Sequence, residues 1–148
     1  MKSYITLLFT IIILVSCSKD NSNVTLQTEA DMLKYIADNS LNANKTNSGL
    51  YYVINNEGTG TRPTSNSNVT VAYKGYFLDG SVFDQNSKGY TTYLTQVIAG
   101  WTEGIQLFKE GGDGILLVPY NLGYGINSRG SIPGGSVLIF DIKLISVN

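Results

Sequence analysis

The sequence predicts a single α+β domain in which a twisted antiparallel β-sheet wraps around one short α-helix, preceded by a small N-terminal helix. Three observations lead to this prediction. Apolar residues alternate with polar ones over most of the chain after residue 50, turn signals separate these stretches, and one interior segment has helical spacing. A length of 148 residues is enough for one compact domain with a tail and too short for two ordinary domains.

The N-terminus is typical of an export signal. Lys2 precedes an apolar run from Tyr4 to Val15, which is shorter than the roughly 20 apolar residues that a membrane-spanning helix needs. The run ends in Leu14-Val15-Ser16-Cys17, which resembles the bacterial lipobox, where the cysteine is lipidated and becomes the first residue of the mature protein. We therefore expect a signal peptide over residues 1–16 and a lipid anchor at Cys17. An ordinary export signal with a chance cysteine at its end is the alternative.

This reading divides the rest of the chain and predicts its location. We expect a polar, lipidated tether over residues 17–27, a helix and linker over 28–47, and the main domain over 48–148. Acyl chains on Cys17 would attach the protein durably to a membrane. The expected location is the cell envelope, with Ser18 favouring the outer membrane and either its periplasmic or its surface face.

The first predicted element is a helix that begins after Thr28. Asp31 follows three residues later, as in a capping box, and Asn39-Ser40 ends the pattern. A helix of this length is marginal alone, so we expect it to pack on the domain or on a second copy of the chain. Its apolar face comprises Met32, Leu33 and Ile36.

The main domain is predicted to contain strands and one helix. The Asp79-Gly80 turn signal predicts a hairpin between residues 69–77 and 82–84. Trp101, Ile105 and Phe108 have helical spacing, and Gly111-Gly112 stops that run. The predicted strands are residues 50–55, 69–77, 82–84, 115–118 and 137–145, and the predicted helix is 101–108.

The composition excludes several classes of chemistry. The chain has no histidine, which removes the usual catalytic triads and most zinc sites, and its single cysteine excludes an internal disulfide and multi-cysteine metal clusters. We expect no metal and no cofactor. A formal net charge of −1 gives no electrostatic reason to expect nucleic acid as a partner.

Aromatic residues are the most prominent side chains of the main domain. Most of the ten tyrosines and five phenylalanines, and the single tryptophan, follow residue 50. Asp84, directly after Phe83, is the one carboxylate set among apolar and aromatic neighbours. Two interpretations stay open from this pattern: aromatic packing with hydroxyl groups at the rim, or an aromatic-lined binding pocket.

Five sequence blocks, in order, resemble FKBP-type peptidyl-prolyl isomerases over about residues 48–147. The resemblance implies the fold described above, with an apolar pocket between the sheet and the short helix. The blocks are Val71-Ala72-Tyr73-Lys74-Gly75 with Leu78-Asp79-Gly80 and Phe83-Asp84; Gln96-Val97-Ile98-Ala99-Gly100-Trp101-Thr102-Glu103-Gly104; Leu122-Gly123-Tyr124-Gly125; Ile132-Pro133; and Leu138-Ile139-Phe140-Asp141.

The resemblance also implies roles for individual residues. Trp101 would form the pocket floor, the Tyr124 hydroxyl and the Ile98 backbone N–H would bind substrate carbonyls, and Asp84 would lie at the edge near the rotating bond. Residues 126–132 would form a flap that places Ile132 on the ligand. The catalytic set is then Tyr73, Phe83, Asp84, Trp101, Tyr124 and Phe140, and the substrate-binding set is Tyr90, Val97, Ile98 and Ile132.

The implied activity is rotation about X–Pro bonds in exported, proline-containing polypeptides, by desolvation in the aromatic pocket and without a cofactor. A non-catalytic binding or scaffolding lipoprotein of the same fold is the alternative. A small β carrier of apolar ligands is disfavoured by the block that ends at Trp101. Gly134-Gly135 stands where the family commonly has a second proline, so we expect a loose flap.

Overall fold

The computed structural model describes residues 24–148. The predicted signal peptide and Cys17 lie outside the described residues. No helix within residues 24–148 is both long and apolar enough to cross a membrane. The helices are α1 (Glu29–Asp38) and α2 (Ala99–Gly104), and the strands are β1 (Asn44–Lys45), β2 (Tyr51–Asn56), β3 (Asn68–Tyr76), β4 (Val82–Tyr93), β5 (Asp113–Val118) and β6 (Leu138–Val147), with 3₁₀ turns at Leu94–Gln96, Ile105–Leu107 and Tyr120–Leu122.

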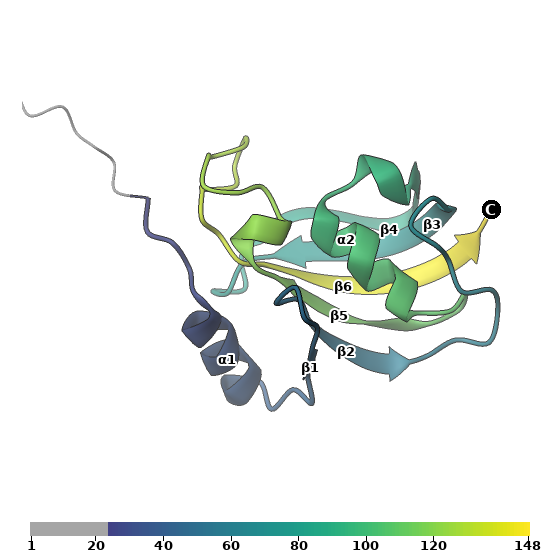
Figure 1. The fold of residues 1–148 in the computed structure, drawn as a ribbon, viewed down its shortest axis with the longest axis horizontal. Coiled ribbons are helices and arrows are strands. Elements are labelled where there is room, and N and C mark those ends of the chain that lie inside the picture. Colours follow the sequence, from purple (N-terminus) through teal and green to yellow (C-terminus); the bar gives the residue numbers. More distant parts are fainter. Residues whose placement is uncertain (1–23) are drawn as a thin grey trace, which may run out of the picture.

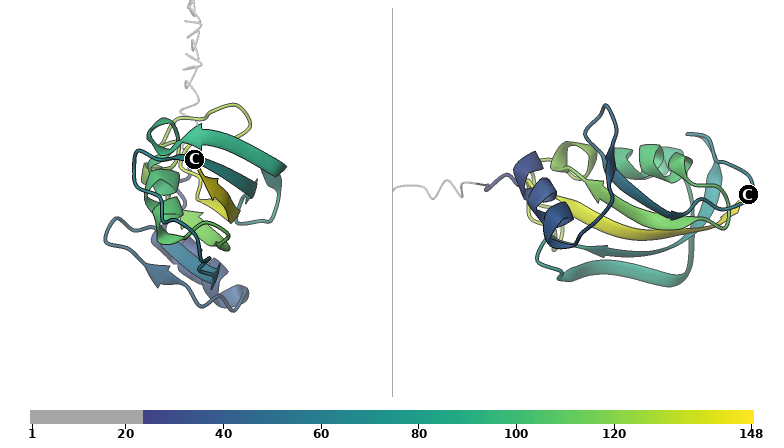
Figure 2. Two further views of the ribbon diagram at one scale, coloured as in Figure 1. Left: turned by 90° about the vertical axis from the view of Figure 1, so that its right-hand side faces the viewer. Right: turned by 90° about the horizontal axis from the view of Figure 1, so that it is seen from below.

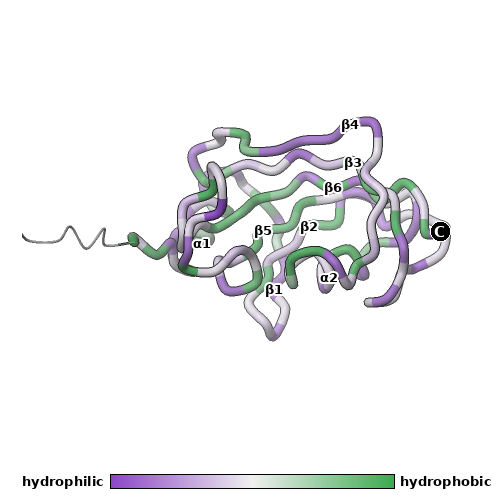
Figure 3. The backbone as a smooth tube through the Cα atoms, turned by 90° about the horizontal axis from the view of Figure 1, so that it is seen from above, coloured by the Kyte–Doolittle hydropathy of each residue, from purple (hydrophilic) through white to green (hydrophobic). Residues whose placement is uncertain are grey.

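The strands form one 6-stranded antiparallel sheet with the order β1-β2-β5-β6-β3-β4 (Figure 1). The sheet curves around α2, which lies across one of its faces. The predicted fold class is therefore confirmed. Hydrophilic residues dominate much of β4, the long strand at one edge (Figure 3).

Helix α2 lies close to the sheet because two of its residues have no side chain. Gly100 and Gly104 are one turn apart and both are buried. A Cβ atom on Gly100 would lie 2.5 Å from the Val118 side chain, and one on Gly104 would lie 2.6 Å from that of Leu116. Both glycines lower the helix propensity, so the tertiary contact with β5 decides the position of the helix. The α-helical part begins two residues earlier than predicted, and the predicted last turn is a 3₁₀ helix.

Helix α1 covers part of the opposite face of the sheet. Met32 is 2% exposed and joins a second core cluster with Tyr51, Leu117 and Ile139. These residues alternate along the strands with those that face α2, so β5 and β6 are buried on both sides. Figure 2 shows α1, in purple, well away from the green α2. The prediction left open whether α1 packs on the domain or on a second copy; within this chain it packs on the domain.

Two strand predictions were incomplete. β4 continues to Tyr93, whereas the sequence predicted a strand only over residues 82–84. An edge strand exposes most of its surface, so the later residues of β4 are polar. Register shifts against β3 also interrupt the alternation of apolar and polar residues from which a strand is predicted. β1 lies within the predicted linker, where its two residues are exposed and pair with β2 through backbone groups.

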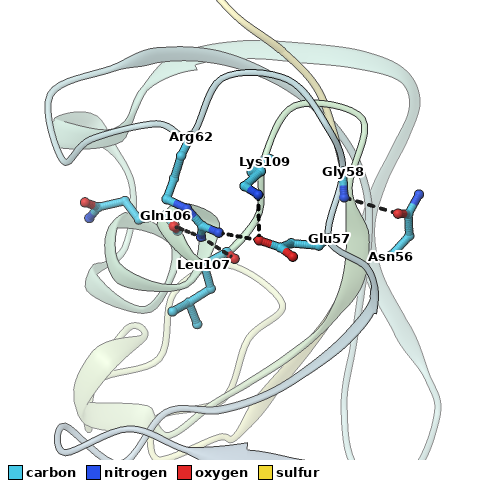
Figure 4. A network of polar contacts seen from close by, with 7 residues as sticks. All are labelled: Asn56, Glu57, Gly58, Arg62, Gln106, Leu107 and Lys109. Carbon is cyan, nitrogen blue, oxygen red and sulfur yellow. Dashed lines mark hydrogen bonds and ion pairs between the residues drawn. The ribbon is translucent and has the colours of Figure 1, made fainter.

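A polar network holds the loop between β2 and β3 against the end of the helical segment (Figure 4). The Arg62 guanidinium donates to the backbone carbonyls of Gln106 and Leu107 at 3.0 and 2.6 Å and pairs with Glu57 at 2.8 Å. Lys109 also pairs with Glu57, at 2.9 Å. Carbonyls at a helix end lack partners within the helix, so a cation there is stabilising. The network anchors the end of the helical segment that lies away from Trp101.

Candidate active site

A cavity of about 570 Å³ opens between the start of α2, strands β3 and β4, and the segment after β5. Nine of the ten predicted pocket residues line this cavity, although their assigned roles remain predictions. The exception is Ile132, which packs against the main core from the flap. The lining residues are Tyr73, Phe83, Asp84, Tyr90, Gln96, Val97, Ile98, Trp101, Gly123, Tyr124, Arg129 and Phe140.

Trp101 lines the cavity and is 5% exposed. Its ring meets those of Tyr73 and Phe140 edge-to-face, with centroids 5.0 and 5.3 Å apart. Phe83 meets Phe140 in the same way at 5.6 Å. Edge-to-face pairs are the favoured arrangement of aromatic rings, so the four residues support one another as a preformed apolar surface.

The local sequence explains why these rings converge. Ile98 is the N-cap residue of α2, and its carbonyl accepts the Trp101 N–H at 2.9 Å, which fixes the first turn and the indole position. Gly75 pairs with Asp84 across the hairpin. A Cβ atom on Gly75 would lie 2.6 Å from the Phe83 ring and 3.0 Å from the Phe140 ring. A glycine is required there because the two rings occupy the space of its side chain.

The principal hydrogen bond among the cavity side chains joins Tyr73 and Asp84. The Tyr73 hydroxyl donates to a carboxylate oxygen of Asp84 at 2.6 Å. Burial, and then this hydrogen bond to Asp84, hold the pKa of Tyr73 well above that of an ordinary tyrosine. The hydroxyl therefore stays protonated at all physiological pH values, and it orients the carboxylate at the cavity edge.

These tyrosines predict a loss of stability at alkaline pH. Burial also raises the pKa of Tyr76, helped by hydrogen bonds to Tyr35 and Asp141. Unfolded tyrosine ionises near pH 10, so above that pH the unfolded state binds fewer protons than the native state, and the free energy of unfolding falls as pH rises. We expect the urea midpoint to be steady on this account below about pH 9 and to fall above about pH 10. Tyr73→Phe should flatten part of that fall, and an unchanged slope would contradict the assignment.

Tyr124 and the exposed Arg129 line one part of the cavity, which we call its mouth. The guanidinium carbon of Arg129 lies 5.1 Å from the centre of the Tyr124 ring, a cation–π contact. Sequence reasoning missed Arg129, Gln96 and Gly123 as lining residues. Gln96 and Gly123 stand in blocks that carry the family resemblance, and Arg129 is the one cation of the predicted flap, so each had a sequence signal.

The root of the flap is tightly packed, while the loose flap expected from Gly134-Gly135 stays a prediction. A Cβ atom on Gly134 would lie 2.0 Å from the carbonyl oxygen of Ile126, and one on Gly135 would lie 2.7 Å from the Leu26 side chain. Gly135 also has a φ of +77°, which favours glycine. The two glycines allow close contact between backbone segments and with the N-terminal segment.

Gln27 connects the N-terminal segment to this flap root. Its backbone N–H donates to the Gly135 carbonyl at 2.9 Å, and its side-chain oxygen accepts the Val137 N–H at 2.6 Å. Val137 is fully buried at the start of the path into β6. The last residues of the stretch predicted as a tether are therefore in contact with the main domain.

We expect Gln27→Ala to lower the free energy of unfolding by about 1–3 kcal/mol, because it leaves the Val137 N–H without its acceptor. Urea denaturation measures this loss. Gln27→Glu is the matched control, since it keeps an acceptor oxygen at the same reach and should retain most of the stability. Equal losses in the two variants would contradict a role for this hydrogen bond.

The acidic side chains of residues 24–148 give no sign of a metal centre. Among residues 24–148 no three acidic or metal-binding side chains gather around one point. The arrangement offers an apolar aromatic recess, a hydroxyl–carboxylate pair at one edge and a tyrosine and a cation at the mouth. It is suited to binding an apolar ring whose attached polar groups face the rim.

Comparison with known proteins gives matches of sequence and of fold. A family model described as FKBP-type peptidyl-prolyl cis-trans isomerase matches residues 59–145. An FKBP-type peptidyl-prolyl cis-trans isomerase FkpA from Buchnera aphidicola is 45% identical over 107 residues, 70% of this chain and 42% of its own. The "Outer membrane protein MIP" of Legionella longbeachae is 42% identical over 130 residues, 80% of this chain and 56% of its own.

Solved structures of proteins with the same kind of name have a similar fold. The crystal structure of FkpA from Escherichia coli superposes with a TM-score of 0.75 at 32% identity, covering 80% of this chain and 58% of that one. A peptidyl-prolyl cis-trans isomerase from Pseudomonas syringae superposes with a TM-score of 0.72 at 30% identity, covering 81% of this chain and 92% of that one. The chain spans 42% of the length of the Buchnera FkpA and 56% of that of the Legionella protein.

Proposed function

The chain belongs to the FKBP-type peptidyl-prolyl cis-trans isomerase family, and we propose that it accelerates rotation about X–Pro bonds in exported polypeptides. The single observation that carries this proposal is the preformed aromatic cavity around Trp101. Its walls accept a proline ring without demanding hydrogen bonds from it.

The physical basis of catalysis is desolvation. Rotation about the imide bond is opposed by resonance, with a barrier of about 18–20 kcal/mol, while the cis and trans forms differ little in energy. At the half-rotated stage, nitrogen and carbonyl lose conjugation and the charge separation of the planar form falls. A cavity that excludes water penalises the polar planar form more than the twisted one, so it lowers the barrier.

The rim groups add a preference for the rotated carbonyl. In this proposal the Tyr124 hydroxyl and the Ile98 backbone N–H bind carbonyls of the substrate, and Asp84 lies near the carbonyl of the rotating bond. Tyr73 contributes its ring to the wall and its hydroxyl to Asp84. No step needs proton transfer, a nucleophile or a metal, so the absence of histidine is no obstacle.

The decisive experiment measures cis-to-trans rates of a proline tetrapeptide with the purified protein. We expect acceleration that is proportional to protein concentration and reduced in Phe140→Ala, which removes a wall of the cavity. If circular dichroism shows a folded protein and the rate stays at background, the proposal is wrong. Peptide binding without acceleration would then favour the non-catalytic alternative.

We also propose that the protein is a lipoprotein of the cell envelope, anchored through Cys17. The lipobox-like sequence supports this, as does similarity to a relative named an outer membrane protein. Uncatalysed proline isomerisation takes tens to hundreds of seconds and can limit folding, so an isomerase held at the membrane would act on newly exported chains.

Cys17→Ser tests the anchor. We expect the wild-type protein to incorporate radiolabelled palmitate and to partition into the detergent phase, and the variant to do neither, because the serine hydroxyl cannot accept the thioether-linked lipid. If wild type and Cys17→Ser partition equally between the phases and wild type incorporates no palmitate, the lipoprotein proposal is contradicted. The isomerase proposal is not affected by that result.

A further inference from the structure

The side chain of Arg129 is held at the cavity mouth by an ordered flap. Its backbone pairs with that of Ile132 in both directions, with N–H to carbonyl distances of 2.9 and 3.0 Å. The Gly134 N–H donates to the Ser128 hydroxyl at 3.1 Å, which closes the base of the same loop. These bonds present the Arg129 guanidinium over the Tyr124 ring and into the lining of the cavity.

Arg129 has a charge that the described part of the chain does not neutralise. The ion pairs within residues 24–148 use the cations of Lys34, Lys45, Arg62 and Lys109. Asp84, the carboxylate that shares the cavity lining, accepts the Tyr73 hydroxyl and takes part in none of these ion pairs. The guanidinium hydrogen bonds within residues 24–148 all belong to Arg62, so the N–H groups of the Arg129 guanidinium are available to an acceptor.

We propose that Arg129 is a specificity-determining residue that favours substrates with an acidic residue immediately before the proline. This inference rests on the proposed function and adds that the substrate carbonyl bound by the Tyr124 hydroxyl is one next to the imide. The side chain of the preceding residue is then attached beside Tyr124 and reaches the mouth where Arg129 lies. A guanidinium binds a carboxylate through two parallel hydrogen bonds, which a neutral amide of the same shape does not match.

The test compares three tetrapeptides, Ala-Glu-Pro-Phe, Ala-Gln-Pro-Phe and Ala-Leu-Pro-Phe, with wild type, Arg129→Gln and Arg129→Lys. The readout is the kcat/KM of the glutamate peptide divided by that of the glutamine peptide, in which any general loss of activity cancels. Since the pair is open to solvent, we expect this ratio to fall about two- to fivefold in Arg129→Gln. Arg129→Lys should retain part of it, and added salt should lower the wild-type ratio.

The outcomes separate this inference from the proposed function. Acceleration of the leucine peptide with the same ratio in wild type and Arg129→Gln would overturn the inference and leave the isomerase activity standing. If no peptide is accelerated, the proposed function fails. The dissociation constant of the glutamate peptide is then compared with that of the glutamine peptide, again in wild type and Arg129→Gln. Binding is followed by intrinsic fluorescence, because the single tryptophan of the chain is Trp101. A ratio of dissociation constants that is the same in wild type and Arg129→Gln would again overturn the inference about Arg129.

Discussion

Trp101→Ala is expected to lower kcat/KM for X–Pro isomerisation by about tenfold or more, which corresponds to about 1.4 kcal/mol or more of lost transition-state stabilisation. The indole lines the cavity and contacts the rings of both Tyr73 and Phe140 edge-to-face. Its removal admits water to the surface that should stay dry and lets the neighbouring rings move. The measurement is the peptide assay at low temperature.

Trp101→Ala also lowers the free energy of unfolding, so its activity is compared with that of a variant that keeps an aromatic ring at this position. Deleting a buried tryptophan side chain costs about 3–5 kcal/mol, a large part of a typical domain's free energy of unfolding. Trp101→Phe keeps an apolar ring on the floor and should lose less of both activity and stability. Full activity in folded Trp101→Ala would mean that the indole takes no part in catalysis.

Phe108→Leu supplies the matched control for core packing. Phe108 is fully buried in the same core cluster but does not line the cavity. We expect it to lower the free energy of unfolding by about 1–3 kcal/mol while kcat/KM stays close to the wild-type value. A loss of activity as large as that of Trp101→Ala would show that general loosening of the core, rather than the cavity floor, limits the rate.

The second large effect is expected for Gly114→Ala, which should lower the free energy of unfolding by about 3 kcal/mol or more. Gly114 lies in β5 between β2 and β6. A Cβ atom there would lie 1.9 Å from the carbonyl oxygen of Val53 and 2.8 Å from the Phe108 ring. A backbone oxygen in a sheet cannot rotate away, so the strands themselves would have to separate. Urea denaturation measures the loss.

Gly123→Ala is the control for the loss of a glycine as such. Its added Cβ would meet the end of the Leu138 side chain at 3.3 Å, and that side chain can shift by a few tenths of an ångström. We therefore expect a smaller loss in the free energy of unfolding than in Gly114→Ala. A loss in Gly114→Ala no greater than in Gly123→Ala would contradict the close approach of β2 to β5.

Much of the candidate site was predictable because it combines a local pattern with a family resemblance. Tyr73, Phe83 and Asp84 lie on the two strands of one hairpin, whose Asp79-Gly80 turn is a strong local signal. Trp101 stands in the first turn of a short helix with recognisable spacing. The end of β4 and the two residues of β1 were not predictable, since their backbone pairing leaves no apolar alternation in the sequence.

The sequence by itself determined the class of the fold and the exclusion of histidine chemistry, because these depend on residue type and on periods of two and 3.6 residues. The aromatic pocket followed from the family resemblance. Only the tertiary structure decided how closely the elements approach one another. The contacts of Gly100, Gly104 and Gly134, the docking of Gln27 on the flap root and the position of Arg129 over Tyr124 join residues distant in the chain. Such contacts depend on the shapes of two surfaces at once, and no pattern along one segment contains that information.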